Sequence, residues 1–138
     1  IKHVHIFAPQ DLGIQDILIS EGHIAHIAPH IETAPYMEIT DGSGKQLTPG
    51  LIDRHVHVSG GGGEGGFATR TPEIQLSALI QAGITTVVGL LGTDGVTRSV
   101  EDLIAKVKAL KSEGISAYAM TGSYAYPSTT ITGYSKKK

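Results

Sequence analysis

Leu47-Thr-Pro-Gly-Leu-Ile-Asp-Arg-His-Val-His57 is the stretch that decides the fold of this chain. It is typical of a buried strand that ends in two histidines one residue apart. Side chains alternate between the two faces of a strand, so we expect His55 and His57 to project to one side and Val56 to the other. Two imidazoles on one side can bind one cation, so the stretch predicts a metal site.

The same tripeptide occurs near the start of the chain as His3-Val4-His5. That copy lies in an alternating run typical of a half-exposed strand, so we interpret its histidines as ordinary solvent-facing residues. The copy at 55–57 instead leads directly into Ser59-Gly-Gly-Gly-Gly-Glu64, a loop with almost no side-chain bulk. Only the second copy therefore has the context of a functional site.

Composition excludes several classes of protein. The chain has 138 residues, of which 40% are hydrophobic and 17% charged, as in ordinary globular proteins. It has no cysteine, so a metal must be held without thiolates, and its net charge of −2 gives no reason to expect nucleic acid. No apolar run approaches the roughly 18 residues that span a bilayer, and the start lacks a signal-peptide layout. We expect a cytoplasmic protein whose two ends look cut.

Periodicity divides the chain near Pro49. Residues 1–48 predict an all-β region, with a tight hairpin turn at Glu21-Gly22 and surface positions for His23, His26 and His30. Its expected strands cover 3–7, 15–20, 23–27 and 37–40. Residues 49–138 alternate strands with helices, which predicts parallel βαβ units with right-handed crossovers. The expected strands there cover 51–58, 84–91 and 115–120.

Two helices are expected between those three strands. The first begins at Thr71-Pro72, runs to about 81 and buries Leu76, Leu79 and Ile80, with Ile74 at the edge of its apolar stripe. The second is capped by Ser99, ends at Glu113-Gly114 and buries Leu103, Ile104, Val107 and Leu110. Polar, glycine-rich loops follow the strands, and chemistry in such folds collects at the carboxyl ends of parallel strands. The histidine pair, Thr93 and Tyr124 all fall there.

Further motifs accompany the histidine pair, namely Gly60-Gly-Gly-Gly-Glu64, Thr69-Arg-Thr-Pro-Glu73, Val88-Gly-Leu-Leu-Gly-Thr-Asp94, Thr121-Gly-Ser-Tyr124 and Ile131-Thr-Gly133. Together with Pro49-Gly-Leu-Ile-Asp-x-His-x-His57, they resemble the N-terminal portion of the β-aspartyl (isoaspartyl) dipeptidases of the amidohydrolase superfamily. The resemblance implies an α/β fold: a small β-sandwich-type region (1–48), then the first three strands and two helices of a (β/α)8 TIM-like barrel (49–138), truncated in this chain.

The resemblance also implies roles for individual residues. His55 and His57 would be metal ligands, in a site that holds two zinc ions in the complete enzyme. Gly62, Gly63, Glu64 and Thr93 would contact an isoaspartyl dipeptide, with the Glu64 carboxylate pairing with its free amino group. The Tyr124 hydroxyl would contact substrate and stabilise the developing oxyanion. A metal-activated hydroxide would then cleave the β-linked amide, and we expect a homo-oligomer that binds neither nucleic acid nor membrane.

Each of these residues also has a structural interpretation. Glu64 fits a solvated loop carboxylate, Thr93 a turn or helix-cap residue, and Tyr124 a locally packed ring. Asp53 lies deeper in the strand, and we interpret it as structural, with support of a metal ligand as the sharper option. Asp94 is typical of a turn. Arg70 is expected to pair with a nearby carboxylate that the sequence does not identify.

A complete barrel needs about 250 residues. The resemblance places the bridging carbamylated lysine, two further histidines, the general-base aspartate and the substrate-binding arginines beyond Lys138. We therefore predict that the 138-residue polypeptide alone is inactive and is the N-terminal portion of a longer enzyme. The alternatives are a cyclic-amide hydrolase of the dihydroorotase or hydantoinase type, which has no use for an anionic anchor at Glu64, and a non-catalytic assembly domain without zinc.

Overall fold

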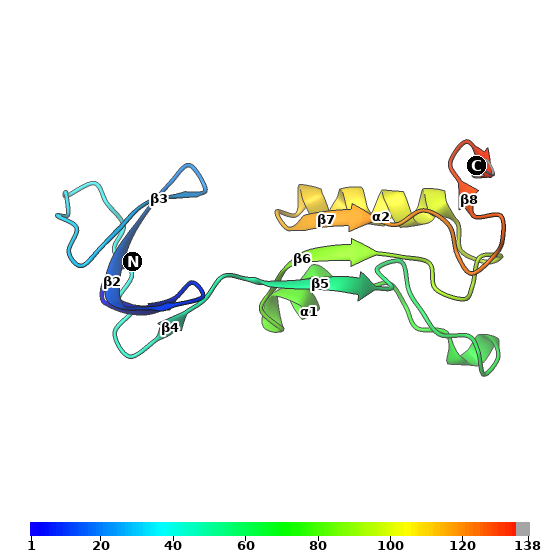
Figure 1. Cartoon of the computed structure of the whole chain (residues 1–138), viewed down its shortest axis with the longest axis horizontal. Coiled ribbons are helices and arrows are strands. Elements are labelled where there is room, and N and C mark those ends of the chain that lie inside the picture. The colour runs from blue at the N-terminus through cyan, green and yellow to red at the C-terminus, as the bar shows by residue number, and fades with distance from the viewer. Residues whose placement is uncertain (135–138) are drawn as a thin grey trace. The chain divides into compact units, whose positions relative to one another are not determined.

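The structure, a computed structural model, describes residues 1–134 and divides into two compact units (Figure 1). The first unit is Ile1–Pro49, and the second begins at Gly50. A small mixed sheet is followed by parallel strands joined through helices, as the predicted fold class requires. The described strands do not close into a barrel.

The first unit is a four-stranded sheet in the order β3-β2-β1-β4. Its strands are β1 (Val4–Phe7), β2 (Asp11–Ser20), β3 (His23–Ala28) and β4 (Gln46–Leu47). Antiparallel pairs join β1 to β2 and β2 to β3, whereas β4 runs parallel to β1. Glu21 and Gly22 both have positive φ, as a tight hairpin turn requires, so that predicted turn is confirmed. Val4, Ile6 and Ile17 form the small core.

Two strand predictions in this unit were wrong. Residues 37–40 form no strand; this segment is held by one isolated bridge, Lys2 to Asp41, and by a backbone hydrogen bond from Lys2 to Thr40. The fourth strand is β4 instead, which the sequence did not indicate. Strand β2 also begins four residues before the predicted start, because its first residues pair with Ile6 and Phe7.

The second unit is built on a three-stranded parallel sheet in the order β5-β6-β7, which confirms the predicted βαβ arrangement. The strands are β5 (Leu51–Val56), β6 (Ile84–Gly89) and β7 (Ser116–Ala119), and the connecting helices are α1 (Leu76–Gln81) and α2 (Val100–Ser112). α1 packs on β6 and α2 packs on β7. The largest side chains buried in this core are Leu79, Leu103, Leu110, Val58 and Val87.

Helix α2 follows its sequence signals closely. The Ser99 hydroxyl accepts a hydrogen bond from the Asp102 backbone N–H at 3.1 Å, which is the predicted N-cap. Leu103, Val107 and Leu110 are buried, and Ile104 packs partly buried against the same core. Because α2 is capped and packed in this way, it anchors the end of the preceding loop, which carries Thr93.

Helix α1 is shorter than predicted. Thr71 and Pro72 do not start it, because the Thr71 backbone N–H donates to the Gly61 carbonyl at 2.8 Å and the Ile74 N–H donates to the Val58 carbonyl at 3.1 Å. The helix begins at Leu76 and buries Leu79, but Ile80 is 55% exposed, contrary to prediction. Residues 71–75 thus form an extended segment that hydrogen-bonds to the loop after β5.

Short elements complete the unit. A 3-10 turn, η1 (Phe67–Thr69), closes the glycine-rich loop, and β8 (Thr129–Thr130) pairs with β9 (Gly133–Tyr134) in a small hairpin that the sequence did not predict. β5 and β6 each end two residues before their predicted ends. Among the described residues, no helix is long and apolar enough to cross a membrane.

Candidate functional site

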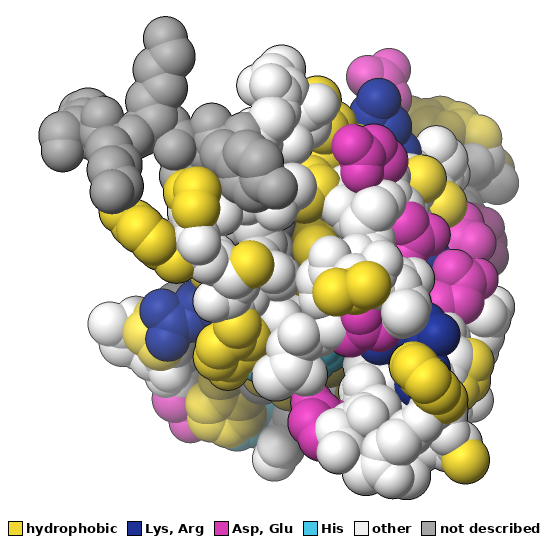
Figure 2. Space-filling view, turned by 90° about the vertical axis from the view of Figure 1, so that its right-hand side faces the viewer, with side chains coloured by type: hydrophobic (Ala, Val, Ile, Leu, Met, Phe, Trp, Pro, Cys, Tyr) yellow, Lys and Arg dark blue, Asp and Glu magenta, His cyan; other side chains and the backbone are white. Residues whose placement is uncertain are grey.

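The loops after β5, β6 and β7 lie at one end of the parallel sheet (Figure 1), as βαβ connectivity requires. They carry every residue predicted to act on substrate or metal except His55, which lies near the end of β5. Figure 2 looks onto this end, and acidic and basic side chains are intermixed over the face that the described residues form, with little histidine surface visible. The site is therefore built from loops, while the strands supply its floor.

His55 lies near the end of β5 and His57 just beyond it. Their ring centroids are 5.5 Å apart and their planes are tilted by 54°. The Asp53 carboxylate accepts a hydrogen bond from the His55 backbone N–H at 3.0 Å, and the pairing with β6 shifts register between Asp53 and Val56. Asp53 thus supports the backbone that carries the first histidine.

The His57 ring is enclosed by two glycines. A Cβ on Gly92 would lie 2.1 Å from His57 Cε1, and a Cβ on Gly61 would lie 3.1 Å from His57 Cβ. Within residues 1–134, His57 Nδ1 is buried and makes no hydrogen bond. Buried polar atoms are nearly always paired, so this nitrogen calls for a partner that these residues do not supply.

The glycine-rich loop folds back onto residues 71–75, the extended segment before α1. Gly61 exchanges two hydrogen bonds with Thr71: its N–H donates to the Thr71 hydroxyl at 2.9 Å, and its carbonyl accepts from the Thr71 N–H at 2.8 Å. Gly62 forms an isolated bridge to Arg70. A Cβ on Gly62 would come within 2.5 Å of the Thr69 carbonyl oxygen, so the loop needs glycine for this close approach.

Glu64 and Thr93 meet across the loops after β5 and β6. The Thr93 hydroxyl donates to Glu64 Oε1 at 2.6 Å. This bond lowers the pKa of Glu64 below its usual range, with smaller contributions from His57 and Arg98. The side chain is exposed, so a stable carboxylate anion faces solvent beside the histidine pair. Thr93 is not a helix cap, since Ser99 caps α2.

Asp94 and Arg98 form a cluster next to these loops. The sequence predicted the turn at Asp94 but not the role of Arg98. The Asp94 carboxylate accepts hydrogen bonds from the backbone N–H groups of Val96 and Thr97 and from the Thr97 hydroxyl, so it is the predicted turn former. These bonds lower its pKa to about 2. It also pairs with Arg98 at 3.3 Å and with Arg70 at 3.9 Å, which identifies the carboxylate beside Arg70.

Arg98 escaped prediction altogether. Its side chain is only 4% exposed, and its Nη2 donates to the Gly61 carbonyl at 3.0 Å. The one available signal was the spacing of Asp94 and Arg98, four residues apart, which is common in surface pairs and carries little information.

Tyr124 lies in the loop after β7 and is 79% exposed, so it does not pack as a local core residue. Its loop is attached to its surroundings in two places. The Thr121 hydroxyl donates to the Thr129 carbonyl at 3.0 Å, and a Cβ on Gly95 would lie 2.3 Å from Ser123 Oγ. The loops after β6 and β7 therefore touch next to Tyr124.

The donor set fits a metal centre in part. Among residues 1–134, no group of three or more histidine, aspartate or glutamate side chains is placed to hold an ion. Two neighbouring imidazoles, one with a buried nitrogen that has no hydrogen-bond partner among residues 1–134, are suited to supply two ligands of a metal site.

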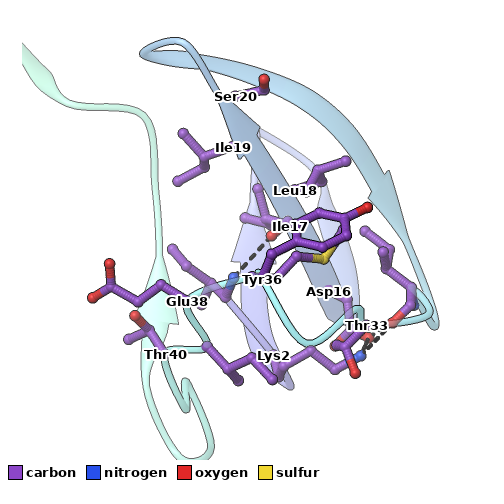
Figure 3. Close-up of a pocket in the computed structure, with 14 residues that line it drawn as sticks. Lys2, Asp16, Ile17, Leu18, Ile19, Ser20, Thr33, Tyr36, Glu38 and Thr40 are labelled. Carbon is purple, nitrogen blue, oxygen red and sulfur yellow. Dashed lines mark hydrogen bonds and ion pairs between the residues drawn. The ribbon is translucent and has the colours of Figure 1, made fainter.

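A separate cavity of about 630 Å³ lies in the first unit (Figure 3). The ion pair of Lys2 and Asp16 lies in its lining, with 2.5 Å between Nζ and Oδ2, and Tyr36 also lines it. Asp16 further accepts hydrogen bonds from the His3 and Ile31 N–H groups, and the Lys2 ammonium holds the pKa of that carboxyl well below its usual range. The Asp16 charge is thus neutralised by Lys2, and a second carboxylate, that of Glu38, also lines the cavity.

Two solved structures are similar to almost the whole chain. Both are of β-aspartyl dipeptidase from the thermophilic, keratin-degrading Fervidobacterium islandicum AW-1. One has a TM-score of 0.89 and 49% identity, covering 96% of this chain and 36% of that one. The other, in complex with a β-Asp-Leu dipeptide, has a TM-score of 0.88 and 50% identity, covering 96% and 35%.

Curated relatives are more distant. Dihydroorotase from Staphylococcus aureus is 36% identical over 110 residues, which are 80% of this chain and 25% of that protein. Dihydroorotase from Bacillus thuringiensis is 36% identical over 96 residues. No family model matches the chain. The chain thus spans about a quarter of the curated relatives and about a third of the solved structures.

Proposed function

We propose that this chain, which resembles the N-terminal portion of the β-aspartyl dipeptidases of the amidohydrolase superfamily, belongs to a longer zinc-dependent hydrolase that cleaves the β-linked amide of isoaspartyl dipeptides. The carrying observation is the contact of Glu64 with Thr93 beside the histidine pair, in a chain about 50% identical to a β-aspartyl dipeptidase. Residues 1–49 and 50–134 would be the β-region and the barrel start.

His55 and His57 would hold the metal as two of its ligands. When bound, zinc would polarise the scissile carbonyl and make water nucleophilic near neutral pH. Asp53 holds the backbone of His55, and Gly61 and Gly92 lie so close to the His57 side chain that this ring has little room to move. Little rearrangement would then be needed on binding.

Glu64 would recognise the free α-amino group that a β-linked aspartyl residue retains. Its lowered pKa keeps it anionic across the physiological range, and an ammonium would meet it in a charge-assisted hydrogen bond. Thr93 donates one hydrogen bond to one oxygen, which fixes the carboxylate and leaves its other oxygen for substrate. Gly62 and Gly63 would let the backbone approach the dipeptide closely.

Tyr124 would act on the scissile carbonyl. Its exposure leaves the hydroxyl accessible, and a phenol that donates to the developing oxyanion is worth about 2 to 4 kcal/mol of transition-state stabilisation. The loop contacts at Thr121 and Gly95 would set its position. We expect a cytoplasmic homo-oligomer.

The second candidate is a cyclic-amide hydrolase, which the identity to dihydroorotases favours. Such a substrate has no free amine, so Glu64 would have no partner in it. The identity to β-aspartyl dipeptidase is higher and extends over more of the chain, which supports the dipeptide as the proposed substrate.

The test is Glu64→Gln in the full-length protein, assayed on β-Asp-Leu, on its N-acetylated form and on dihydroorotate. We expect kcat/KM for β-Asp-Leu to fall by about tenfold or more, the effect of losing a charged hydrogen-bond partner. The acetylated dipeptide should be a poor substrate of both proteins.

Glu32→Gln is the matched control, since it removes the same charge from a side chain that is 95% exposed in the first unit. It should leave all rates unchanged. Preferential hydrolysis of dihydroorotate would favour the second candidate, and absence of zinc from the purified full-length protein would favour a non-catalytic assembly domain.

A further inference from the structure

Arg98 immediately precedes the cap of α2 and is the one arginine of the described residues that is buried. Its guanidinium reaches back beneath the glycine-rich loop rather than out to solvent. Nη2 donates to the Gly61 carbonyl at 3.0 Å and lies 3.4 Å from the Thr71 carbonyl. A Cβ on Gly60 would lie 3.2 Å from the same nitrogen, so the loop backbone is seated directly on it.

The two carbonyls that Arg98 contacts belong to the residues that clamp the loop. Gly61 and Thr71 are joined by two hydrogen bonds, and Glu64 follows Gly61 by three residues. A cation that holds both carbonyls therefore fixes the point from which the loop extends to Glu64.

The other side of the guanidinium belongs to the loop after β6. Nη1 donates to Asp94 Oδ2 at 3.3 Å, and Asp94 directly follows Thr93. One side chain thus ties the loop that carries Glu64 to the loop that carries Thr93. These are the two residues whose side chains meet at 2.6 Å.

Stability alone does not explain this arrangement. Placing a charge in a protein interior carries a desolvation cost, and apolar groups of similar volume often stabilise a protein as well or better. Within residues 1–134, Arg98 Nε is also buried without a hydrogen bond. What the arginine provides is a fork that reaches two loops in fixed directions.

We propose that Arg98 is a positioning residue, which fixes the glycine-rich loop against the Thr93 loop and thereby sets the place of the Glu64 carboxylate. The part of this inference that concerns substrate rests on the proposed function. In this role Arg98 would act through the loop backbone at Gly61 and Thr71 and through Asp94, not through a contact of its own with substrate.

A double-mutant cycle with Glu64 tests it in the full-length protein. Arg98→Met should lower kcat/KM for β-Asp-Leu by about tenfold or more with zinc content retained. Arg98→Met combined with Glu64→Gln should lose no more than Glu64→Gln alone, since both act through one carboxylate. Losses that multiply, or an Arg98→Met protein with unchanged kcat/KM, would overturn the proposal. If Arg98→Met does not fold, Arg98→Lys, which keeps the charge but lacks the fork, is read in the same way.

Hydrogen exchange gives a readout that does not depend on the substrate. Arg98→Met should speed exchange of amides in residues 60–72, including the Thr71 N–H, and leave residues 103–112 of α2 unchanged. Lys106→Met is the matched control, because Lys106 pairs from α2 with Glu73 at 3.4 Å without touching the loop. Unchanged exchange in 60–72, or equal acceleration in the control, contradicts the proposal. If Glu64→Gln leaves kcat/KM for β-Asp-Leu unchanged, the proposed substrate is refuted. The hydrogen-exchange result would still decide whether Arg98 positions the loop.

Discussion

The chain contains the tripeptide His-Val-His twice, and the two copies have different surroundings. In the first, His5 Nε2 lies 2.6 Å from an Asp11 carboxylate oxygen, and the ring stacks on Phe7 with centroids 4.5 Å apart. In the second, the rings of His55 and His57 lie with centroids 5.5 Å apart and tilted planes, and His57 Nδ1 is buried without a partner among residues 1–134. In the first copy His5 thus has partners on β1 and β2, whereas the buried nitrogen of His57 has none among the described residues.

Two histidines one residue apart are therefore not enough to form a metal site. Neither pair lies within one regular strand, because His3 has a positive φ of 57° and precedes β1, and His57 follows the end of β5. The His57 ring is flanked by the loops after two successive strands, with Gly61 and Gly92 at positions where a Cβ would approach it too closely, whereas His55 is exposed. The loops, more than the histidines, distinguish the two copies.

The largest effect is expected when each histidine pair is removed in turn from the full-length protein, which tests whether only the pair at 55–57 binds metal. His55→Ala with His57→Ala should lower zinc content and reduce activity by more than about a hundredfold, since even residues that only support metal ligands cost 10- to 100-fold. His3→Ala with His5→Ala should leave both unchanged. Metal analysis and kinetics on the two double variants decide it; zinc retained in the first would remove the 55–57 pair from the proposed site.

A smaller effect is expected from Gly92→Ala. The new methyl would overlap the His57 ring, and the residue also has a φ of +70°. We expect zinc affinity to fall by about 10- to 100-fold. Gly83→Ala is the matched control, with a φ of +72° and nothing within 4 Å of its Cβ, so it should show only the backbone cost of about 1 to 2 kcal/mol. Equal zinc affinities, measured by competition with a chelator, would mean that the His57 ring is free to move.

The smallest effect concerns the carboxylates near the two copies. The pKa of Asp94 is lowered to about 2 by the Thr97 hydroxyl and nearby N–H groups, whereas Asp11, whose pKa is lowered mainly by the Gly13 N–H, is 58% exposed. A carboxyl with a lowered folded-state pKa contributes stability above its unfolded value near 3.8 and loses it as the pH falls toward 2.

Asp94→Asn should therefore lower the free energy of unfolding at pH 7, and the difference from the parent protein should shrink between pH 4 and pH 2. Asp11→Asn should change it less, because exposed pairs contribute little. Denaturant unfolding at several pH values measures both. A pH-independent deficit in Asp94→Asn would show that packing, not charge, is lost.

Much of the second unit was predictable because its signals are local. Ser99 caps α2, Gly83 ends α1, and apolar strands alternate with amphipathic helices, so the parallel sheet and its loop-bearing end followed from the sequence. The helix start at Thr71 was wrong because the Thr71 hydroxyl accepts from the Gly61 N–H, ten residues away, and the Ile74 N–H, which a cap would serve, donates to the Val58 carbonyl. Strand β4 was not predicted because a strand of two residues is too short to show an alternation of apolar and polar side chains.

From the sequence came the order of the elements from β5 to β7, the position of the histidine pair and the likeness to a dipeptidase, because periodicity, caps and motifs depend on neighbouring residues. Tertiary structure alone decided that Glu64 meets Thr93, that Gly92 borders His57 and that Arg98 joins two loops. These contacts join residues 29 to 37 positions apart. Such pairs are set by how strands stack in the sheet, which no local pattern encodes.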